Sequence, residues 1–169
     1  MQNTAAFWDV EANTVTSITD ANVFNFSVGN KVTDEGIVIG NFPDPNYPIS
    51  VTNDDGTVTE DLLISAGVWK DGEWTSLGLG DYAGPPTSIT GGSAANSISL
   101  DGKVISGYTN TPVPGATNLK LSPYSWTYND GVWEGQAWAE PENVTQGSII
   151  LDSSSDGQMA AGWSNIGYG

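Results

Sequence analysis

The chain has 169 residues, of which 20 are Asp or Glu and 4 are Lys, so its formal net charge at pH 7 is −16. A surface of this charge repels phosphate backbones and anionic lipids, which argues against nucleic acid and acidic membranes and favours neutral or cationic partners. The sequence has no Cys and no His, which excludes disulfides, thiolate or imidazole metal ligands and a Ser-His-Asp triad.

Hydrophobic residues occur in short runs bounded by Gly, Pro, Asn and Asp, and helical periodicity is nearly absent, which predicts an all-β protein. No apolar run approaches the roughly 20 residues of a membrane helix, so no membrane insertion is expected. One pattern occurs three times: a Trp, a tight turn, and a second turn ending in Gly before a short apolar run closed by an aromatic residue. Each copy is long enough for one antiparallel four-stranded unit, so the sequence predicts repeated units.

The first predicted unit covers about residues 5–42. It begins at Phe7-Trp8-Asp9, and its closing apolar run ends at Phe42. We expect turns at Ala12-Asn13 and Glu35-Gly36, because tight turns favour Asn and Gly.

A hairpin insertion is predicted at about residues 43–64. Three prolines interrupt strand pairing after the first unit, and two β-branched runs then flank a polar turn. The prolines are Pro43, Pro45 and Pro48, and the two runs are residues 49–52 and 57–59.

The turn of this insertion, Asn53-Asp54-Asp55-Gly56, also resembles part of a calcium loop. The match is incomplete, because Val51 stands where an acid is needed and Leu62 stands where the loop has Glu. A plain turn is therefore the favoured interpretation, and no metal site is predicted. Asp152 and Asp156 allow the same two interpretations, with the same preference.

The second predicted unit covers about residues 65–109 and the third about residues 122–165. In the second unit we expect strands at residues 66–70, 73–77, 97–99 and 103–108. The expected hairpin turns of both units are Asp71-Gly72, Asp101-Gly102, Asp130-Gly131 and Asp156-Gly157. Long loops at Gly84-Pro85-Pro86 and Pro112-Val113-Pro114-Gly115 project from the units and are places where binding usually resides.

The segment from Ile98 to Tyr108, together with Ala66-Gly67-Val68-Trp69 and Leu77-Gly78, resembles the HAF-type repeats of bacterial extracellular proteins. The resemblance implies β-propeller-like blades, and all three copies match it in outline. It implies nothing specific about activity. Propellers typically close with about four to eight blades, whereas three copies are present. We therefore expect a partial propeller: the chain belongs to a longer protein, or chains associate to complete a ring, or the three units stack openly with exposed edges that must be protected.

Aromatic residues supply the candidate ligand-binding positions. Trp8, Trp69 and Trp126 recur at matching places, so we expect them to be buried in the core. Aromatic residues without a counterpart in every copy are better candidates for contact with a sugar or a protein, because a flat ring with a polar group suits such surfaces. These candidates are Trp74, Trp133 and Trp138. Tyr82 is a further candidate because of its position in a projecting loop.

Carboxylates are the only general acid/base groups present in quantity, so glycoside cleavage by a carboxylate pair is the natural enzymatic alternative. Glu134, Glu140 and Glu142 cluster near two of the candidate Trp residues. An exposed acidic loop explains the same cluster, and we assign no catalytic residue.

We expect a non-catalytic binding or interaction module of an extracellular or cell-surface bacterial protein, without a cofactor. Its expected partner is a neutral glycan or a protein. The missing His, Cys and Arg, the acidic surface rich in Ser, Thr, Asn and Gly, and the projecting loops favour this interpretation. The resemblance to HAF-type repeats implies the extracellular location. A carboxylate-dependent glycoside hydrolase and a structural spacer are the alternatives.

Overall fold

The computed structural model of the chain describes residues 5–18, 27–53, 55–80, 92–112 and 119–166. Within these ranges the chain forms β-strands and no helix, which confirms the predicted all-β class. The strands are β1 (Ala5–Asp9), β2 (Thr14–Ile18), β3 (Val28–Val32), β4 (Val38–Thr52), β5 (Val58–Lys70), β6 (Glu73–Gly78), β7 (Ser93–Ile98), β8 (Val104–Pro112), β9 (Leu119–Asn129), β10 (Val132–Ala137), β11 (Val144–Ser153) and β12 (Ala160–Ile166).

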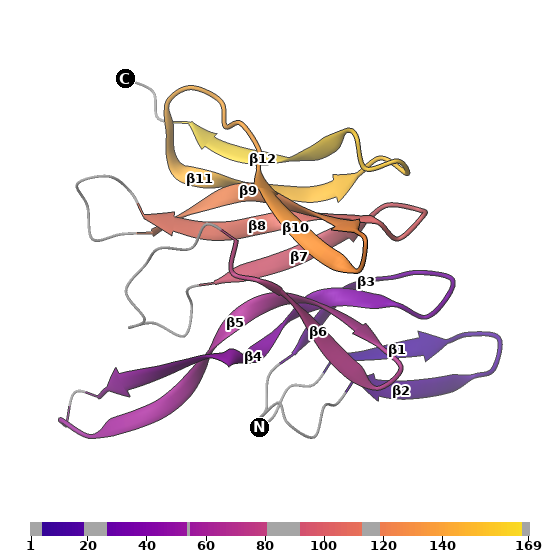
Figure 1. Cartoon of the computed structure of the whole chain (residues 1–169), viewed down its shortest axis with the longest axis horizontal. Helices are drawn as coiled ribbons and strands as arrows, with labels where there is room; N and C mark the ends of the chain where they lie inside the picture. The colour runs from indigo at the N-terminus through magenta and orange to yellow at the C-terminus, as the bar shows by residue number, and fades with distance from the viewer. Residues whose placement is uncertain (1–4, 19–26, 54, 81–91, 113–118, 167–169) are drawn as a thin grey trace.

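The strands are arranged in three sheets that are almost entirely antiparallel. β1 and β2 form a two-stranded sheet, and β3, β4, β5 and β6 form a four-stranded sheet in that order. The third sheet has the order β12-β11-β9-β8-β7, with β10 also paired to β9. Figure 1 shows the β1–β2 hairpin and the β11–β12 hairpin at opposite ends of the described structure, so the strands do not close into a ring.

The sheets do not coincide with the predicted units. β4 begins in the first predicted unit and β5 ends in the second, yet the two strands pair with each other, with Val38 opposite Trp69. In the same way β8 pairs with β9 across the next predicted boundary, with Ile105 opposite Trp126. The β1–β2 hairpin has no third strand in the described part of the chain.

Three hairpins have the same local geometry, and we call them the inner hairpins: β3–β4, β7–β8 and β11–β12. In each of them the register shifts by one residue at one point, which is the signature of a β-bulge. The β11–β12 hairpin has a second irregularity, between Val144 and Gly147. The bulged residues are Asn30, Asn96 and Leu151.

A glycine lies beside each of these bulges, because the preceding strand leaves no room for a side chain. A Cβ atom added to Gly40 would lie 1.8 Å from the carbonyl oxygen of Val28. The corresponding contacts are 2.0 Å from Gly107 to Ala94 and 1.8 Å from Gly162 to Ile149. These glycines are required by close approach of two backbones rather than by a turn.

Side-chain amides at two of the bulges join consecutive inner hairpins. Asn30 donates through Nδ2 to the carbonyl oxygen of Ala95 at 2.8 Å, and Asn96 donates to the carbonyl oxygen of Ile150 at 2.6 Å. These bonds hold β3 next to β7 and β7 next to β11. The third bulge carries Leu151, which is apolar and exposed.

Two of the predicted hairpin turns are confirmed by their backbone dihedral angles. Asp71-Gly72 joins β5 to β6 and Asp130-Gly131 joins β9 to β10, and all four residues have positive φ, as a type I′ hairpin requires. The predicted insertion is a continuation of β4 and β5. The pairing of these strands is interrupted between Pro43 and Pro48 and then resumes to the hairpin end.

The hydrophobic core lies between the sheets and contains two of the three repeated Trp residues. Trp126 is 1% exposed and Trp69 is 8% exposed, whereas Trp8 is 67% exposed. The prediction of burial is therefore wrong for Trp8. Trp69 and Trp126 lie on strands with a partner on both sides, while the strand of Trp8 is paired only with β2 in the described structure.

Candidate functional site

A hollow of about 330 Å³ lies where the three inner strands β3, β7 and β11 end. The loops that follow these strands provide most of its wall. Its lining combines apolar side chains, hydroxyl groups and charged groups: Lys31, Val32, Thr33, Asp34, Glu35, Ile98, Ser99, Leu100, Ser153 and Ser155. We call it the loop pocket.

Two of the loops around this pocket have the same internal hydrogen bonds. The Asp101 carboxylate accepts from Ser99 Oγ at 2.7 Å and from the Lys103 backbone N–H at 3.1 Å. The Asp156 carboxylate accepts from Ser154 Oγ at 2.6 Å and likewise from a backbone N–H two residues later. These bonds lower the pKa of both carboxyl groups, the hydroxyl bond being the larger cause. They fix the loops as turns.

The insertion turn uses its acid in the same way. The Asp55 carboxylate accepts from Thr57 Oγ1 at 2.6 Å and from the Thr57 backbone N–H at 2.9 Å. Asp54 lies outside the described residues. Within the described ranges no group of three or more acidic side chains is placed to hold a metal ion.

A charged network adjoins the loop pocket. Asp152 Oδ1 accepts from Lys31 Nζ at 2.9 Å and from Ser97 Oγ at 2.9 Å. These three residues each follow the bulge of a different inner hairpin. The bond from Lys31, followed by that from Ser97, lowers the pKa of the Asp152 carboxyl to about 2. Asp152 is therefore ionised at neutral pH and neutralises the lysine.

A second hollow, of about 230 Å³, runs beside β12. We call it the aromatic groove, because Trp138 and Trp163 both line it. Trp138 donates through Nε1 to Ser125 Oγ at 2.8 Å, and Trp163 is 45% exposed. The other lining residues are Pro123, Ala139, Pro141, Ser148, Ile149, Ile150, Ala160, Ala161, Gly162 and Ser164.

The predicted ligand-binding residues lie in different surroundings. Trp74 is 9% exposed and stacks on Phe42, with ring centroids 5.0 Å apart. Trp133 is partly buried against the core and tilts against Tyr128. Of the predicted set, Trp138 alone lines one of the two hollows; Tyr82 lies outside the described residues.

Sequence reasoning did not propose Trp163 as a binding residue, although it closes the third copy of the repeated pattern. Its counterparts in the alignment of the inner hairpins, Asn41 and Tyr108, are partly buried beside a further strand. The exposure of Trp163 follows from the open edge of β12, which periodicity in the sequence does not reveal.

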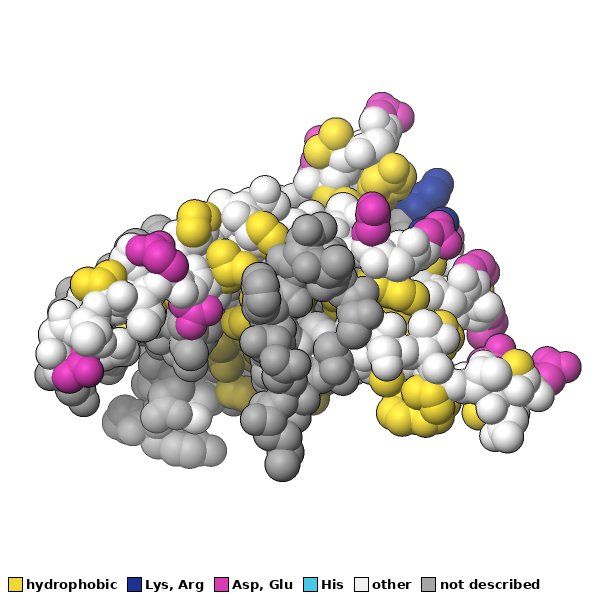
Figure 2. Space-filling view, turned by 90° about the horizontal axis from the view of Figure 1, so that it is seen from below, with side chains coloured by type: hydrophobic (Ala, Val, Ile, Leu, Met, Phe, Trp, Pro, Cys, Tyr) yellow, Lys and Arg dark blue, Asp and Glu magenta, His cyan; other side chains and the backbone are white. Residues whose placement is uncertain are grey.

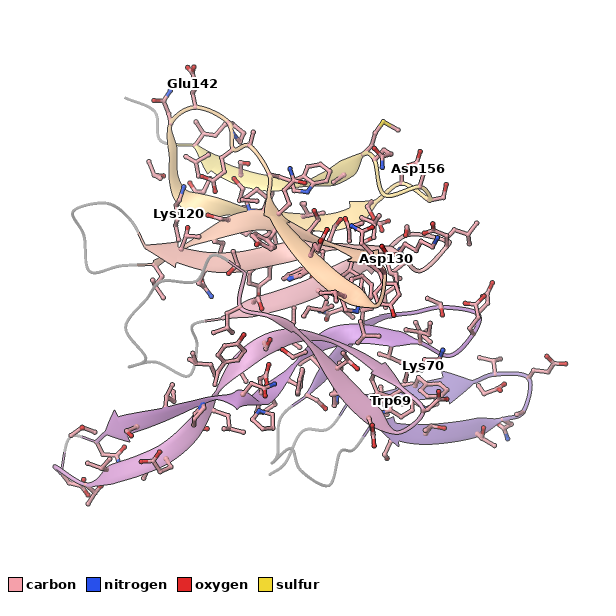
Figure 3. The ribbon with its side chains drawn as sticks, viewed as in Figure 1. Trp69, Lys70, Lys120, Asp130, Glu142 and Asp156 are labelled. Carbon is pink, nitrogen blue, oxygen red and sulfur yellow. The ribbon has the colours of Figure 1, made fainter. Side chains whose placement is uncertain are left out.

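The three clustered glutamates have different surroundings in the described structure. Glu134 accepts from Asn129 at 2.7 Å, and Glu140 pairs with Lys120. Figure 3 shows Glu142 on the loop before β11, pointing away from the ribbon, and Asp156 beyond the other end of that strand.

Within the described residues no helix is long and apolar enough to span a membrane. Comparisons of the chain with protein-family models, with curated proteins and with solved structures find no match.

Proposed function

We propose that this chain is a non-catalytic interaction module of an extracellular or cell-surface protein, and that the loop pocket is its binding site. The preferred ligand is a protein segment that presents an apolar side chain beside a cationic one. The convergence of loops from three inner hairpins on one hollow is the observation that carries this proposal. Loops held by a rigid β scaffold are common binding surfaces.

The chemistry of the pocket supports this ligand. Leu100 is 81% exposed and Val32 is 49% exposed, and both line the pocket. Asp34 and Glu35 are exposed beside them. Lys31 is already paired with Asp152, so the remaining charge of the pocket is negative. Figure 2 shows acidic side chains scattered over much of the visible face, which adds long-range attraction for a cationic segment.

The HAF-like blade interpretation also belongs to this proposal. On it, β3–β6 and β7–β10 are two blade-like units, each built from an inner hairpin and the hairpin that follows. We call β5–β6 and β9–β10 the outer hairpins. The matching bulges and glycines of the inner hairpins support this assignment of strands to units. The loop pocket then lies where the inner strands of neighbouring blades end together.

A neutral glycan is the second candidate ligand, and the aromatic groove is the observation that favours it. Two Trp side chains and the hydroxyls of Ser148 and Ser164 line that groove, and such a surface suits stacking on a sugar. Among the described residues that line the loop pocket there is no aromatic side chain, which is why the protein segment is preferred there.

Selection from a random peptide library on the immobilised chain tests the preferred ligand. We expect enrichment of peptides that carry Lys or Arg next to a large apolar residue. Leu100→Asp should weaken the enriched peptides by about tenfold or more, and rising salt should weaken them further. The matched control is Val58→Asp, at an exposed valine of β5 outside the pocket. Failure to enrich such peptides, or equal binding by both variants, contradicts the proposal.

A glycan array followed by a reducing-sugar release assay separates the other possibilities. Glycan binding that Trp138→Ala removes would favour the second candidate. Sugar release that Glu134→Gln or Glu140→Gln abolishes would favour the glycoside hydrolase. An absence of both glycan and peptide binding would favour a structural spacer.

A further inference from the structure

We propose that a second copy of this chain docks its β1–β2 hairpin along the open edge of β12. The two hairpins β11–β12 and β1–β2 are then the inner and outer halves of one four-stranded unit, contributed by different copies. The inference goes beyond the proposed binding function, and it rests on pairings and hydrogen bonds in the described residues.

The first observation is that β1 sits against β3 as β5 sits against β7. The backbone N–H of Ala5 on β1 donates to Ser27 Oγ at 3.1 Å, just before β3. The backbone N–H of Ala66 on β5 donates to Ser93 Oγ at 2.9 Å, at the start of β7. Trp8 and Trp69 each lie three residues beyond the donating alanine.

The second hydrogen bond of each serine extends this correspondence to the next strand. Ser27 Oγ donates to the carbonyl oxygen of Ile18 at 3.4 Å, and Ser93 Oγ donates to that of Gly78 at 2.7 Å. Ile18 is the register partner of Ala5, and Gly78 is the register partner of Ala66. The β1–β2 hairpin therefore holds the position of an outer hairpin.

The third observation is that each half lacks the strand pairing that joins the inner and outer hairpins of the complete units. The second strands of two inner hairpins, β4 and β8, each pair with a strand of an outer hairpin, with Gly40 opposite Gly67 and Gly107 opposite Tyr124. Gly162 holds the corresponding position on β12, but β12 pairs only with β11 in the described structure. β1 lacks an inner partner in the same way. The correspondence places Gly162 opposite Ala6 and Ala160 opposite Trp8 of the second copy.

Both open strands expose apolar side chains and lack the charges that usually protect a sheet edge. Trp8 is 67% exposed, Trp163 45% and Ile166 46%. β12 has no charged residue and no proline, and β1 has one charge, at its last residue Asp9. Figure 1 shows these two edges at opposite ends of the described structure, so one copy cannot pair them with each other.

In a ring of two copies, the open edges of β1 and β12 would both be paired. Each copy contributes the units β3–β6 and β7–β10 and two halves, which gives six units per pair of chains. Six lies within the four to eight blades of typical propellers, whereas three does not. A second copy is therefore the occupant that fits the two complementary halves.

In this assembly the aromatic groove would lie at the interface between the two copies. In the complete unit β7–β10, strand β9 covers the edge of β8, with Tyr124 opposite Gly107. The corresponding residue of β12, Gly162, lines the aromatic groove, so β1 of the second copy would cover that side of the groove. Glycan binding in the groove and this docking are mutually exclusive.

Engineered cysteines test the docking, since the chain has none of its own. Opposed residues of antiparallel strands have Cα atoms about 4.5 to 5.5 Å apart, which suits a disulfide. We expect Trp8→Cys protein mixed with Ala160→Cys protein to form a disulfide-linked pair in mild oxidant. The control is Val15→Cys mixed with Ala160→Cys. Val15 is exposed and lies opposite Trp8 on β2, one strand too far from β12 to be bridged.

The unaltered chain supplies the second measurement, because Trp8→Cys removes apolar surface from the interface. Light scattering should give twice the chain mass of 17.7 kDa, and more of that species in high salt because both copies are strongly acidic. Amide hydrogen exchange on β12 should slow as the protein concentration rises. A monomer at every concentration overturns the proposal, and so does a dimer in which both cysteine pairs cross-link equally.

Discussion

Lys31 Nζ lies 2.9 Å from Asp152 Oδ1, although the two residues are 121 positions apart in the sequence. The pair joins the first inner strand, β3, to the last, β11. Ser97, on the inner strand between them, donates to the same carboxylate oxygen. One acid therefore ties together all three inner hairpins beside the loop pocket.

The first prediction concerns the pH dependence of the stability that the Asp152 carboxylate contributes. The pKa of Asp152 is lowered from 3.8 to about 2 in the folded chain, so its contribution to stability is fully present above pH 4 and is lost as the pH falls through about 2. The side chain of Asp152 is 66% exposed, so screening limits the contribution to about 0.2–1 kcal/mol. Asp152→Asn should lower the free energy of unfolding by that amount at pH 7 and by almost nothing at pH 2.

Urea unfolding at the two pH values measures this difference, with Glu142→Gln, at an exposed carboxyl, as the control. A loss of stability in Asp152→Asn that is the same at both pH values would show that the carboxylate charge has no part in it.

Local sequence signals were enough to predict the strand class and most turns. The Asp-Gly pairs at residues 71–72 and 130–131 have the positive φ values that these residues were expected to adopt. The prolines 43 and 48 mark the interruption in the β4–β5 pairing. These features depend on the chemistry of two or three neighbouring residues, which the sequence displays directly.

The grouping of the strands into units could not be predicted in the same way. The same recurring pattern fits a unit that begins at Trp8 and a unit that begins at β3, and the choice depends on which strands hydrogen-bond across the loops. The exposed Trp8 and Trp163 are consequences of that choice. The candidate Trp residues were likewise predicted from their lack of counterparts, which carries no information about burial, and Trp74 is buried.

The second prediction concerns the close approach of strands at the inner hairpins. Gly107→Ala should destabilise the chain by about 3 kcal/mol or more, because its Cβ would lie 2.0 Å from the Ala94 carbonyl oxygen. Gly102 is the matched control: its φ is +71° and nothing lies within 4 Å of an added Cβ. Gly102→Ala should therefore cost only the strain of that backbone conformation, about 1 kcal/mol. Thermal unfolding ranks the two variants, and similar losses would contradict the geometry.

The third prediction concerns the amide bonds between inner hairpins. Asn96→Ala removes the donor to the Ile150 carbonyl oxygen and should cost about 1 to 2 kcal/mol, because the acceptor loses its partner in a partly buried site. Asn129→Ala is the control, since its bond to Glu134 is exposed and should be worth less than about 0.5 kcal/mol. Denaturant unfolding measures both. Equal losses would show that the bulge amide does not join the hairpins.

The fourth prediction separates the repeated Trp residues by what covers them. Trp126 is 1% exposed and packs against Tyr124, with ring centroids 5.1 Å apart, so Trp126→Ala should lower the free energy of unfolding by about 3 to 5 kcal/mol. Trp8 is 67% exposed, so Trp8→Ala should cost less than about 0.5 kcal/mol in dilute protein. If a second copy covers Trp8, the cost of Trp8→Ala will grow with protein concentration, because association stabilises the folded chain by mass action. The cost of Trp126→Ala will stay nearly constant. Urea titrations of both variants at a low and a high protein concentration measure these four values, and a large cost for Trp8→Ala in dilute protein would contradict the exposure on which the prediction rests.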